Sequence, residues 1–285
     1  MDSEARGYAL PHFNVSDSSA LKAIVFAAKE LNKPVMIGVS EGEREFVGIN
    51  EVAALVRSYK EELNIPIFLN ADHTHSLEGI KIAAKAGFDE VLFDGSKLSL
   101  EENLKQTKEA VTIAKAINPE IIVEGELGYI GSSSEILKET PEGASLNPEM
   151  FTKPEEAQAF VKETGVDVFS PAVGNMHGLL ESMVKGDVKK RLDIARIGEI
   201  KKMCGAFLTL HGGSGTADED FVAAIKSGIN IIHINTELRL AWRKGLEKEL
   251  MEKPNEVAPY KLLDGAEEEI KKVVLERMKL FYGMK

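Results

Sequence analysis

Short apolar runs alternate with amphipathic segments along almost the whole chain. The runs are of strand length, and most of them end at Gly, Pro or polar residues, which predicts buried strands. The predicted strands cover residues 8–15, 34–39, 65–70, 90–94, 120–127, 166–173, 206–212 and 229–235. Helical spacing of apolar residues fills most of the intervals between them. The predicted helices cover residues 20–32, 50–63, 76–87, 99–117, 153–165, 193–204 and 219–228.

Two stretches depart from this alternation. The chain from Gly128 to about Thr152 is polar and rich in Ser, Glu and Pro, which predicts a functional lid or a disordered segment. From about residue 237 onwards the pattern is helical and strongly charged, and it predicts mostly solvated helix faces.

Repeated strand–helix units with apolar strands predict a parallel sheet that is covered by helices. Eight such units in about 250 residues predict a closed (β/α)8 barrel, also called a TIM barrel. No segment has the composition of a domain linker, so we expect one domain over residues 1–285 with a C-terminal helical extension. A doubly wound open sheet is the alternative. It usually has a glycine-rich turn after the first strand, and residues 8–15 are followed by none.

Charge and cysteine content narrow the class of protein. The chain has 35 basic and 46 acidic residues, and the net charge of −11 argues against non-specific nucleic-acid binding. An anionic substrate would therefore need a local positive focus, such as a metal, a helix N-terminus or a few arginines. Cys204 is the one cysteine, which excludes an intrachain disulfide and fits a reducing, cytoplasmic location. We expect no membrane segment, because no apolar run approaches about 20 residues, and no signal peptide, because the N-terminus is acidic.

Candidate ligands stand where several predicted strands end. His73, His177 and His211 each follow an apolar run, and Glu126 ends another. The carboxyl ends of barrel strands meet at one face, so these side chains should converge. Three imidazoles with a carboxylate suit Zn²⁺, which keeps one position open in catalytic sites. Other residues at the strand ends are Asp72, Asp94, Glu124, His233 and Asn235.

Two other histidines are interpreted differently. His75 follows His73 by two residues and is either a residue that supports the ligands or simply exposed. His12 is expected to pack in the core or line the pocket.

A glycine-rich segment follows the last of the three candidate ligands. The sequence His211-Gly-Gly-Ser-Gly215 lies between a predicted strand and a predicted helix. Such a turn lets backbone N–H groups and a helix N-terminus approach a phosphate, and barrels often bind phosphate after their seventh and eighth strands. The metal and phosphate predictions therefore fall at the same face.

Seven segments together resemble the class II, metal-dependent fructose-bisphosphate/tagatose-bisphosphate aldolase family. They are FNV near the N-terminus, SEG, ADH, VEGELG, GNMHG, LHGGSG and NTELR, and they occur in the family's order between residue 7 and about residue 245. The resemblance implies a lyase of glycolysis or related carbohydrate metabolism that uses a metal-stabilised enediolate. The short chain resembles the family's smaller subgroup, whose members are commonly homotetramers or homodimers.

The resemblance also implies roles for individual residues. His73, His177 and His211 match the ligands of the catalytic Zn²⁺. Glu126 matches a residue at an alternative or second metal position, and Asp94 matches its acidic partner. The implied cofactor is Zn²⁺, with a second divalent or a monovalent cation as a further option.

The substrate pocket is implied in the same way. Asp72 matches the acid/base that acts on the C4 oxygen of the ketose. Asn14 and Ser40 match polar residues of the pocket. The residues that match the phosphate site are Gly178, Gly212, Gly213, Ser214, Asn235 and Thr236.

Three positions depart from the family's pattern. His233 stands where the family has an asparagine that contacts the reacting end of the ketose, and Asn235 replaces a frequent aspartate. The lid reads GSSSE instead of a GGEED-like sequence, so Glu135 is the first candidate for the lid base, with Glu139 and Glu142 as alternatives. The metal pattern is intact, but fructose 1,6-bisphosphate, tagatose 1,6-bisphosphate and other ketose phosphates stay open as substrates.

Two other functions are alternatives to an aldolase. The H-x-H pair at residues 73–75 has the form used by metal-dependent amidohydrolases, but that class places it after the first strand and an aspartate after the eighth. The second alternative is a barrel that binds ligands without catalysis, because His233 and the lid sequence depart from the family's pattern.

Overall fold

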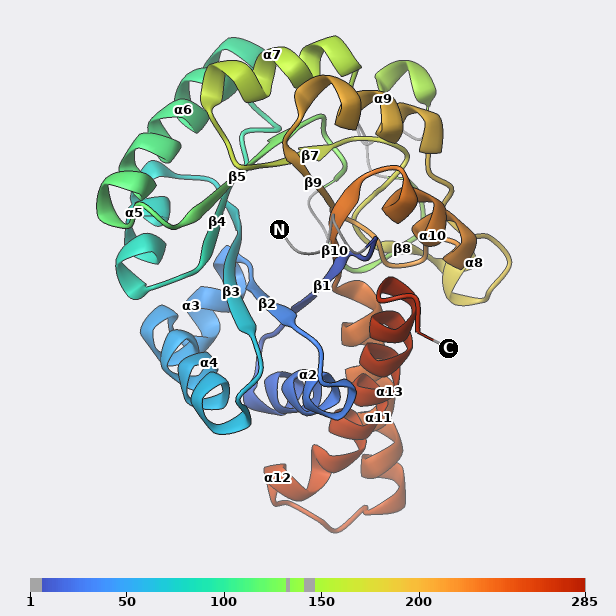
Figure 1. Cartoon of the computed structure of the whole chain (residues 1–285). Helices are drawn as coiled ribbons and strands as arrows, with labels where there is room; N and C mark the ends of the chain where they lie inside the picture. Colours follow the sequence, from blue (N-terminus) through green and yellow to red (C-terminus); the bar gives the residue numbers. More distant parts are fainter. Residues whose placement is uncertain (1–6, 132–133, 141–146, 285) are drawn as a thin grey trace.

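The computed structural model describes residues 7–131, 134–140 and 147–284, and in it eight parallel strands form a closed barrel with helices outside (Figure 1). Around the barrel the order is β1-β10-β9-β7-β5-β4-β3-β2. The strands are β1 (Leu10–Asn14), β2 (Val35–Val39), β3 (Ile67–Thr74), β4 (Glu90–Phe93), β5 (Ile122–Leu127), β7 (Val168–Pro171), β9 (Phe207–Leu210) and β10 (Ile229–Ile234). The predicted (β/α)8 barrel is confirmed, and the open doubly wound sheet is wrong because β1 pairs with both β2 and β10.

Each predicted helix is present. The helices are α2 (Ser18–Leu31), α4 (Ile49–Leu63), α5 (Leu77–Ala86), α6 (Leu100–Ile117), α7 (Pro154–Thr164), α9 (Ile194–Cys204), α10 (Asp218–Lys226) and α11 (Thr236–Glu252). Local signals explain their ends: Asp17 caps α2 by accepting a hydrogen bond from the Ala20 N–H, and Asn32 ends it in the left-handed conformation. Shorter elements that the pattern did not predict are α3 (Glu41–Val47), β6 (Ile136–Leu137), η1 (Pro148–Met150), β8 (Leu179–Leu180), α8 (Glu181–Val184) and α12 (Pro259–Leu262).

The barrel interior changes from apolar to polar along the strands. Side chains alternate across a strand, so every second residue points inward. At the strand starts Leu10 and Ile231 belong to a small apolar cluster. Two residues further along, His12 and His233 are buried and stacked on each other. The polar ends of the strands therefore form the floor of a site at the carboxyl face.

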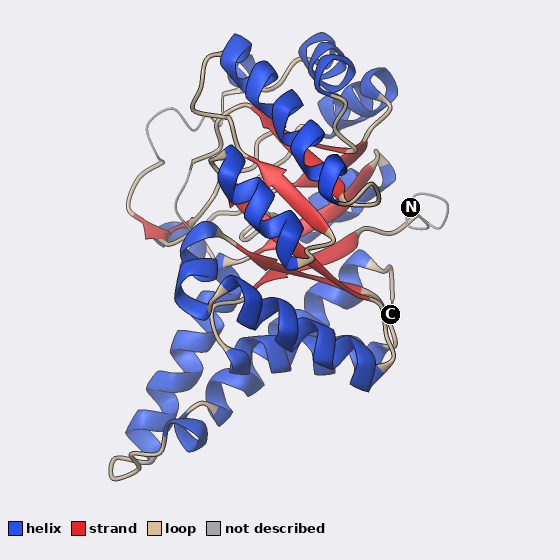
Figure 2. Ribbon diagram, turned by 90° about the vertical axis from the view of Figure 1, so that its left-hand side faces the viewer, coloured by secondary structure: helices blue, strands red, loops and turns tan. Residues whose placement is uncertain are grey.

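The C-terminal region corrects one prediction. Helix α13 (Asp264–Phe281) buries Ile270, Val274, Met278 and Phe281 and packs against α11 and α2. The expectation of mostly solvated faces is wrong for this helix, because a helical stripe of apolar residues is hidden among its charges. The part of the C-terminal region around α12 does project away from the barrel (Figures 1 and 2).

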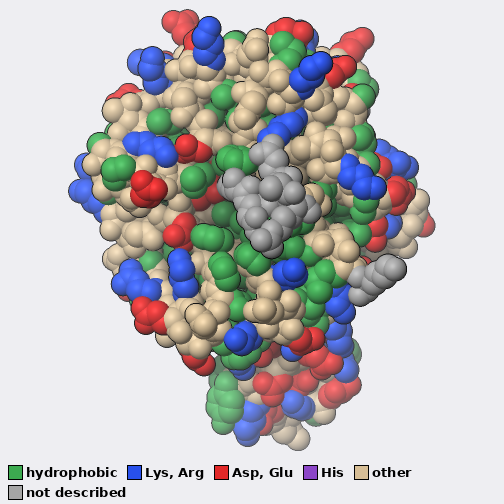
Figure 3. Space-filling model, viewed as in Figure 1, with side chains coloured by type: hydrophobic (Ala, Val, Ile, Leu, Met, Phe, Trp, Pro, Cys, Tyr) green, Lys and Arg blue, Asp and Glu red, His purple; other side chains and the backbone are tan. Residues whose placement is uncertain are grey.

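A second, smaller sheet lies outside the barrel sheet. β6 pairs with β8, so part of the predicted lid segment is ordered into a two-stranded sheet. On the face shown in Figure 3, Lys and Arg side chains are interspersed with Asp and Glu. None of the described helices is long and apolar enough to span a bilayer.

Candidate active site

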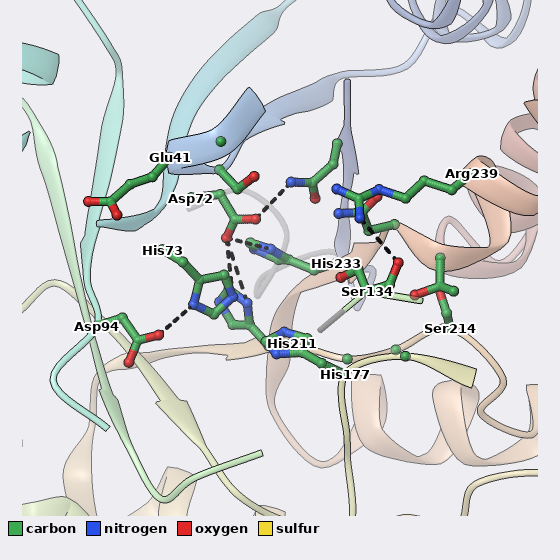
Figure 4. A pocket seen from close by; sticks show the side chains of 18 of the residues that line it. Glu41, Asp72, His73, Asp94, Ser134, His177, His211, Ser214, His233 and Arg239 are labelled. Atoms are coloured by element: carbon green, nitrogen blue, oxygen red, sulfur yellow. Dashed lines mark hydrogen bonds and ion pairs between the residues drawn. The ribbon is translucent and has the colours of Figure 1, made fainter. Parts of the chain in front are cut away.

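A pocket opens at the carboxyl ends of the barrel strands (Figure 4). Most of the site residues predicted from the sequence line it, but Glu124, Glu126, Glu135 and Glu139 do not. Those that do are Asn14, Ser40, Asp72, His73, Asp94, His177, Gly178, His211, Gly212, Gly213, Ser214, His233, Asn235 and Thr236. Residues from seven strands and the turns that follow them thus meet in one place, as closure of the barrel requires.

His73 is held by Asp94 at the end of β3. The Nδ1 atom of His73 lies 2.9 Å from the Asp94 carboxylate, and its Nε2 atom has no hydrogen bond within the described structure. The backbone of His73 has φ = 42°, and the β3–β4 register shifts between Ala71 and Thr74. An irregularity of this kind re-aims a side chain, and here it accompanies an imidazole directed into the pocket.

The other two histidines are oriented in the same manner. His177 Nδ1 lies 2.7 Å from the Gly131 carbonyl oxygen, and His211 Nε2 lies 2.9 Å from Glu124 Oε1. Each of the three rings thus has one nitrogen in contact with an oxygen atom. One ring nitrogen from each of His73, His177 and His211 lies within 4.8 Å of the other two. Oxygen partners of this kind fix the tautomer and orientation of metal-ligating histidines.

The electrostatics of these residues suit a divalent cation. Burial and the charge of His73 lower the pKa of both His177 and His211 to about 3, so both are neutral, the form that binds a metal. Burial acts to lower the pKa of His73, but Asp72, Asp94 and other acids raise it to about 10. Carboxylates that stabilise a proton on His73 also stabilise a metal ion beside it. The donor set therefore fits Zn²⁺.

A second group of candidate ligands lies next to the first. His73, Asp94 and Glu126 also bring one ligand atom each within 4.8 Å. Burial and the charge of Asp94 raise the pKa of Glu126 well above its usual range. The Oε2 atom of Glu126 is buried without a hydrogen-bond partner among the described residues. This geometry is compatible with the alternative metal position expected for Glu126, although the residue lies outside the pocket lining.

Asp72 lies at the centre of the polar cluster. Asn14 donates a 2.8 Å hydrogen bond to its Oδ2 atom. Its Oδ1 atom lies 3.6 to 3.8 Å from nitrogens of His73, His211 and His233. Burial acts to raise the pKa of Asp72, but His73 and His233 hold it well below its usual range. The result is an ionised carboxylate that faces the pocket and can accept a proton.

His233 is wedged between two other imidazoles. It stacks on His12 with ring centroids 3.4 Å apart, and its other side lies 3.9 Å from the ring of His211. His12 is placed by a contact of 3.3 Å with Asn70, deep in the barrel. His12 is buried as predicted, and His233 is directed toward Asp72 through Nδ1.

The ring of His12 occupies space that a side chain at position 38 would fill, and Gly38 keeps that space free. A Cβ atom on Gly38 would lie 2.0 Å from the nearest atom of that ring. We expect Gly38→Ala to lower the free energy of unfolding by about 1–3 kcal/mol, because an overpacked core must shift. The measurement is urea unfolding. Gly198→Ala, in α9 with no atom near the added Cβ, is the matched control and should be neutral or stabilising by up to about 1 kcal/mol. Equal effects of the two changes would contradict this packing.

The glycine turn, residues 211–215, requires glycine at more than one position. Gly212 has φ = 61°, and a Cβ there would lie 2.5 Å from the backbone of Met176. At Gly213 a Cβ would lie 2.7 Å from the His233 carbonyl oxygen. Ser214 Oγ accepts a 3.2 Å hydrogen bond from the backbone of α11 at Glu237. The turn is therefore packed tightly between two strand ends and beside the start of α11.

Two charged residues of the site were not singled out from the sequence. Glu43 is buried and accepts hydrogen bonds from Asn14 and from the Ser40 N–H, both within 2.9 Å. Arg239 lines the pocket and lies 2.7 Å from Glu43. The spacing of Ser40 and Glu43 is a capping box, which begins α3 and could have indicated Glu43. Arg239 is the last residue of the NTELR segment, but its contact with Glu43 joins distant parts of the chain.

The lid residues are not brought to the metal cluster. Glu135 and Glu139 are exposed, and neither lines the pocket. Glu142 lies outside the described residues. Ser134 does line the pocket, and its carbonyl accepts a 3.1 Å hydrogen bond from Arg239. The lid base therefore stays a prediction.

His75 does not join the three candidate ligands. Its ring is about half exposed, and its Nδ1 atom lies 3.2 Å from the backbone oxygen of Asp94. His73 and His75 thus do not form the paired ligands that an amidohydrolase would need.

Comparison with known proteins agrees with this geometry. The family model described as fructose-bisphosphate aldolase class-II matches residues 1–284. A fructose-bisphosphate aldolase from Geobacillus stearothermophilus is 34% identical over 277 residues, which cover 96% of this chain and 91% of that protein. The crystal structure of the YdjI aldolase from Escherichia coli K12 has a TM-score of 0.81 and 28% identity, over 98% of this chain and 94% of the other.

A more distant structure shares the fold. The fructose-bisphosphate aldolase from Campylobacter jejuni has a TM-score of 0.81 at 20% identity, over 99% of this chain and 92% of the other. The whole-chain match to the family model and the extent of the relatives' similarity establish that the protein belongs to the class II fructose-bisphosphate aldolase family, and that it is an aldolase of the lyase class.

Proposed function

We propose that the protein cleaves a ketose 1,6-bisphosphate, fructose 1,6-bisphosphate foremost, to glycerone phosphate and glyceraldehyde 3-phosphate, and forms the same bond in reverse. The observation that carries the proposal is the convergence of His73, His177 and His211, each oriented by an oxygen, beside an ionised Asp72. Curated relatives with the name fructose-bisphosphate aldolase support the choice of the fructose substrate.

The three histidines would hold Zn²⁺ and Glu126 would provide the alternative position. Bound zinc supplies Lewis-acid chemistry: it polarises the ketose carbonyl and stabilises negative charge that develops there.

The chain's own residues would handle protons and positioning. Asp72 takes the proton from the C4 hydroxyl as the C3–C4 bond breaks, and the electron pair of that bond stays with C3 of the ketone fragment. Asn14 holds the Asp72 carboxylate in place through its 2.8 Å hydrogen bond. A carboxylate of the lid segment, Glu135 first among them, returns a proton to C3.

The glycine turn and its neighbours would bind one phosphate. Gly178, Gly212, Gly213 and Ser214 line the pocket beside Asn235 and Thr236, where α11 begins. A helix N-terminus and backbone N–H groups favour an anion at this position. Fixing the phosphate holds the reacting carbons beside Asp72, which lowers the entropic cost of reaction.

The test is a coupled assay of aldol cleavage over a panel of ketose phosphates, with zinc content measured on the same preparation. We expect zinc in each chain, cleavage of fructose 1,6-bisphosphate above the others, and loss of activity with EDTA. Faster cleavage of tagatose 1,6-bisphosphate would change the substrate and keep the chemistry. A zinc-loaded protein that cleaves no ketose phosphate would contradict the proposal. Light scattering tests the expected homodimer or homotetramer.

A further inference from the structure

Lys190 is a buried lysine that the aldol chemistry above does not use. The residue is 2% exposed, although lysine is rarely buried without an acidic partner. Its Nζ atom lies 2.5 Å from the Met176 carbonyl oxygen, 2.7 Å from that of Gly178, 3.1 Å from that of Gly212 and 2.6 Å from that of Ser214. No carboxylate of the described chain is in hydrogen-bond contact with it.

The four carbonyl groups form a cage for a cation. Two of the carbonyl groups, those of Met176 and Gly178, lie on either side of His177 in the chain. The other two, those of Gly212 and Ser214, follow His211. Rings of backbone carbonyl oxygens replace the hydration shell of monovalent cations in proteins. An ammonium group has three donors and no acceptor, whereas a neutral amine would turn its lone pair toward a carbonyl oxygen. Burial lowers the pKa of Lys190 to about 7, with Glu237 opposing the shift, and the carbonyl oxygens further favour the charged form.

The backbone holds Lys190 against the glycine turn. The Lys190 N–H donates to the Gly215 carbonyl at 2.9 Å, and the Ala217 N–H donates to the Lys190 carbonyl at 3.2 Å. A parallel bridge with Thr216 lies between these two bonds. The backbone of Lys190 is therefore fixed to the glycine turn, and its buried Nζ group is held by the four carbonyl oxygens.

The position of this charge matters for an anion in the pocket. Gly178, Gly212 and Ser214 line the pocket, and their carbonyl oxygens touch the ammonium group, so the charge lies one peptide behind the pocket wall. The other ammonium or guanidinium group in the described lining is that of Arg239, which is paired with Glu43. Unlike Arg239, Lys190 has no acidic partner in contact among the described residues, so its positive charge beside the pocket is not neutralised by an ion pair.

We propose that the Lys190 ammonium group is a built-in monovalent cation, which joins the two pocket turns and supplies positive charge to the phosphate subsite without a free ion. The part of this inference that concerns phosphate rests on the proposed function. The cage itself does not.

The test compares three variants in KCl, NH₄Cl or choline chloride at constant ionic strength. Wild type should show the same kcat/KM in all three salts. Lys190→Ala opens the cage, and in choline chloride it should lose at least about tenfold in kcat/KM, mainly through KM. K⁺, NH₄⁺ or added methylammonium should recover much of that loss. Lys190→Met should lose as much and recover nothing, because its side chain still fills the cage. Lys189→Ala, at the exposed neighbouring position, is the matched control and should behave as wild type.

Two readouts do not depend on activity. KCl should raise the melting temperature of Lys190→Ala above that in choline chloride, but not that of wild type. Crystals of Lys190→Ala soaked in Tl⁺ should show an anomalous peak among the four carbonyl oxygens, and wild-type crystals should show none.

The outcomes separate the two proposals. A wild type that needs K⁺, or a Lys190→Met variant with unchanged KM, would overturn the role of the lysine charge. A Lys190→Ala variant that binds no cation by melting temperature and anomalous scattering would overturn the cage. If wild type cleaves no ketose phosphate while Lys190→Ala binds Tl⁺, the cage stands and the proposed aldolase substrate fails.

Discussion

Replacing Asp72 by Ala is expected to lower kcat for ketose bisphosphate cleavage by about 10²–10⁴, the usual contribution of a positioned general acid or base. The carboxylate is ionised, faces the pocket and has one oxygen without a hydrogen bond in the described structure. Asp72 is not one of the three residues that would hold zinc, so the zinc content of the variant should stay at the wild-type level. The measurement is steady-state cleavage together with zinc analysis.

The same variant can separate two proton transfers. Asp72 would act on the C4 hydroxyl, whereas a different carboxylate would act on the C–H bond of glycerone phosphate. Asp72→Ala should therefore still exchange the C–H proton of glycerone phosphate with solvent, as followed by isotope incorporation. Asp187→Ala, at an exposed position, is the matched control and should retain both activities. Normal cleavage by Asp72→Ala would rule out the assigned role.

Replacing His177 by Ala is expected to remove both the metal and the activity. Loss of a residue that only orients a ligand costs about 10–100-fold in metal affinity, so loss of a ligand should cost more. His177 is also held in place by the Gly131 carbonyl oxygen, 2.7 Å from its Nδ1 atom. Zinc content after dialysis and kcat in zinc-containing buffer are the measurements.

Two further variants grade this effect. Glu124→Ala removes the partner of His211 Nε2 and should weaken zinc binding by about 10–100-fold while the ligands stay in place. His75→Ala is the histidine control, since its ring is directed to the Asp94 backbone and lies outside the three-histidine group. Full zinc content in His177→Ala, or loss of zinc in His75→Ala, would show that the ligand set is wrong.

Much of the fold and of the site could be predicted from the sequence because both depend on local patterns. Alternation of apolar strands and amphipathic helices implies the barrel, and barrel closure places His73, His177 and His211 at one face. Asp72 follows from its place beside His73 at the same strand end. Residues at strand ends can be predicted from the sequence, since their place at the carboxyl face of the barrel depends on where an apolar run stops.

Other features depend on packing between distant segments. Charged residues surround the apolar stripe of α13 in the sequence, and only its contact with α2 and α11 shows that it is buried. The sequence gives no reason for a histidine at position 233, whereas the structure places His233 between His12 and His211 and beside Asp72.

The sequence by itself determined the barrel, the three strand-end histidines with Asp72, and the glycine turn, because each of them follows from a local sequence pattern. Only the tertiary structure decided where Lys190 and Arg239 act. Each of these side chains lies in a charged stretch of sequence that is typical of solvated surface, and its partners are backbone or carboxylate oxygens from other parts of the chain. Carbonyl oxygens are the same in every residue, so their convergence on one ammonium group leaves no mark in the sequence and exists only once the barrel has closed.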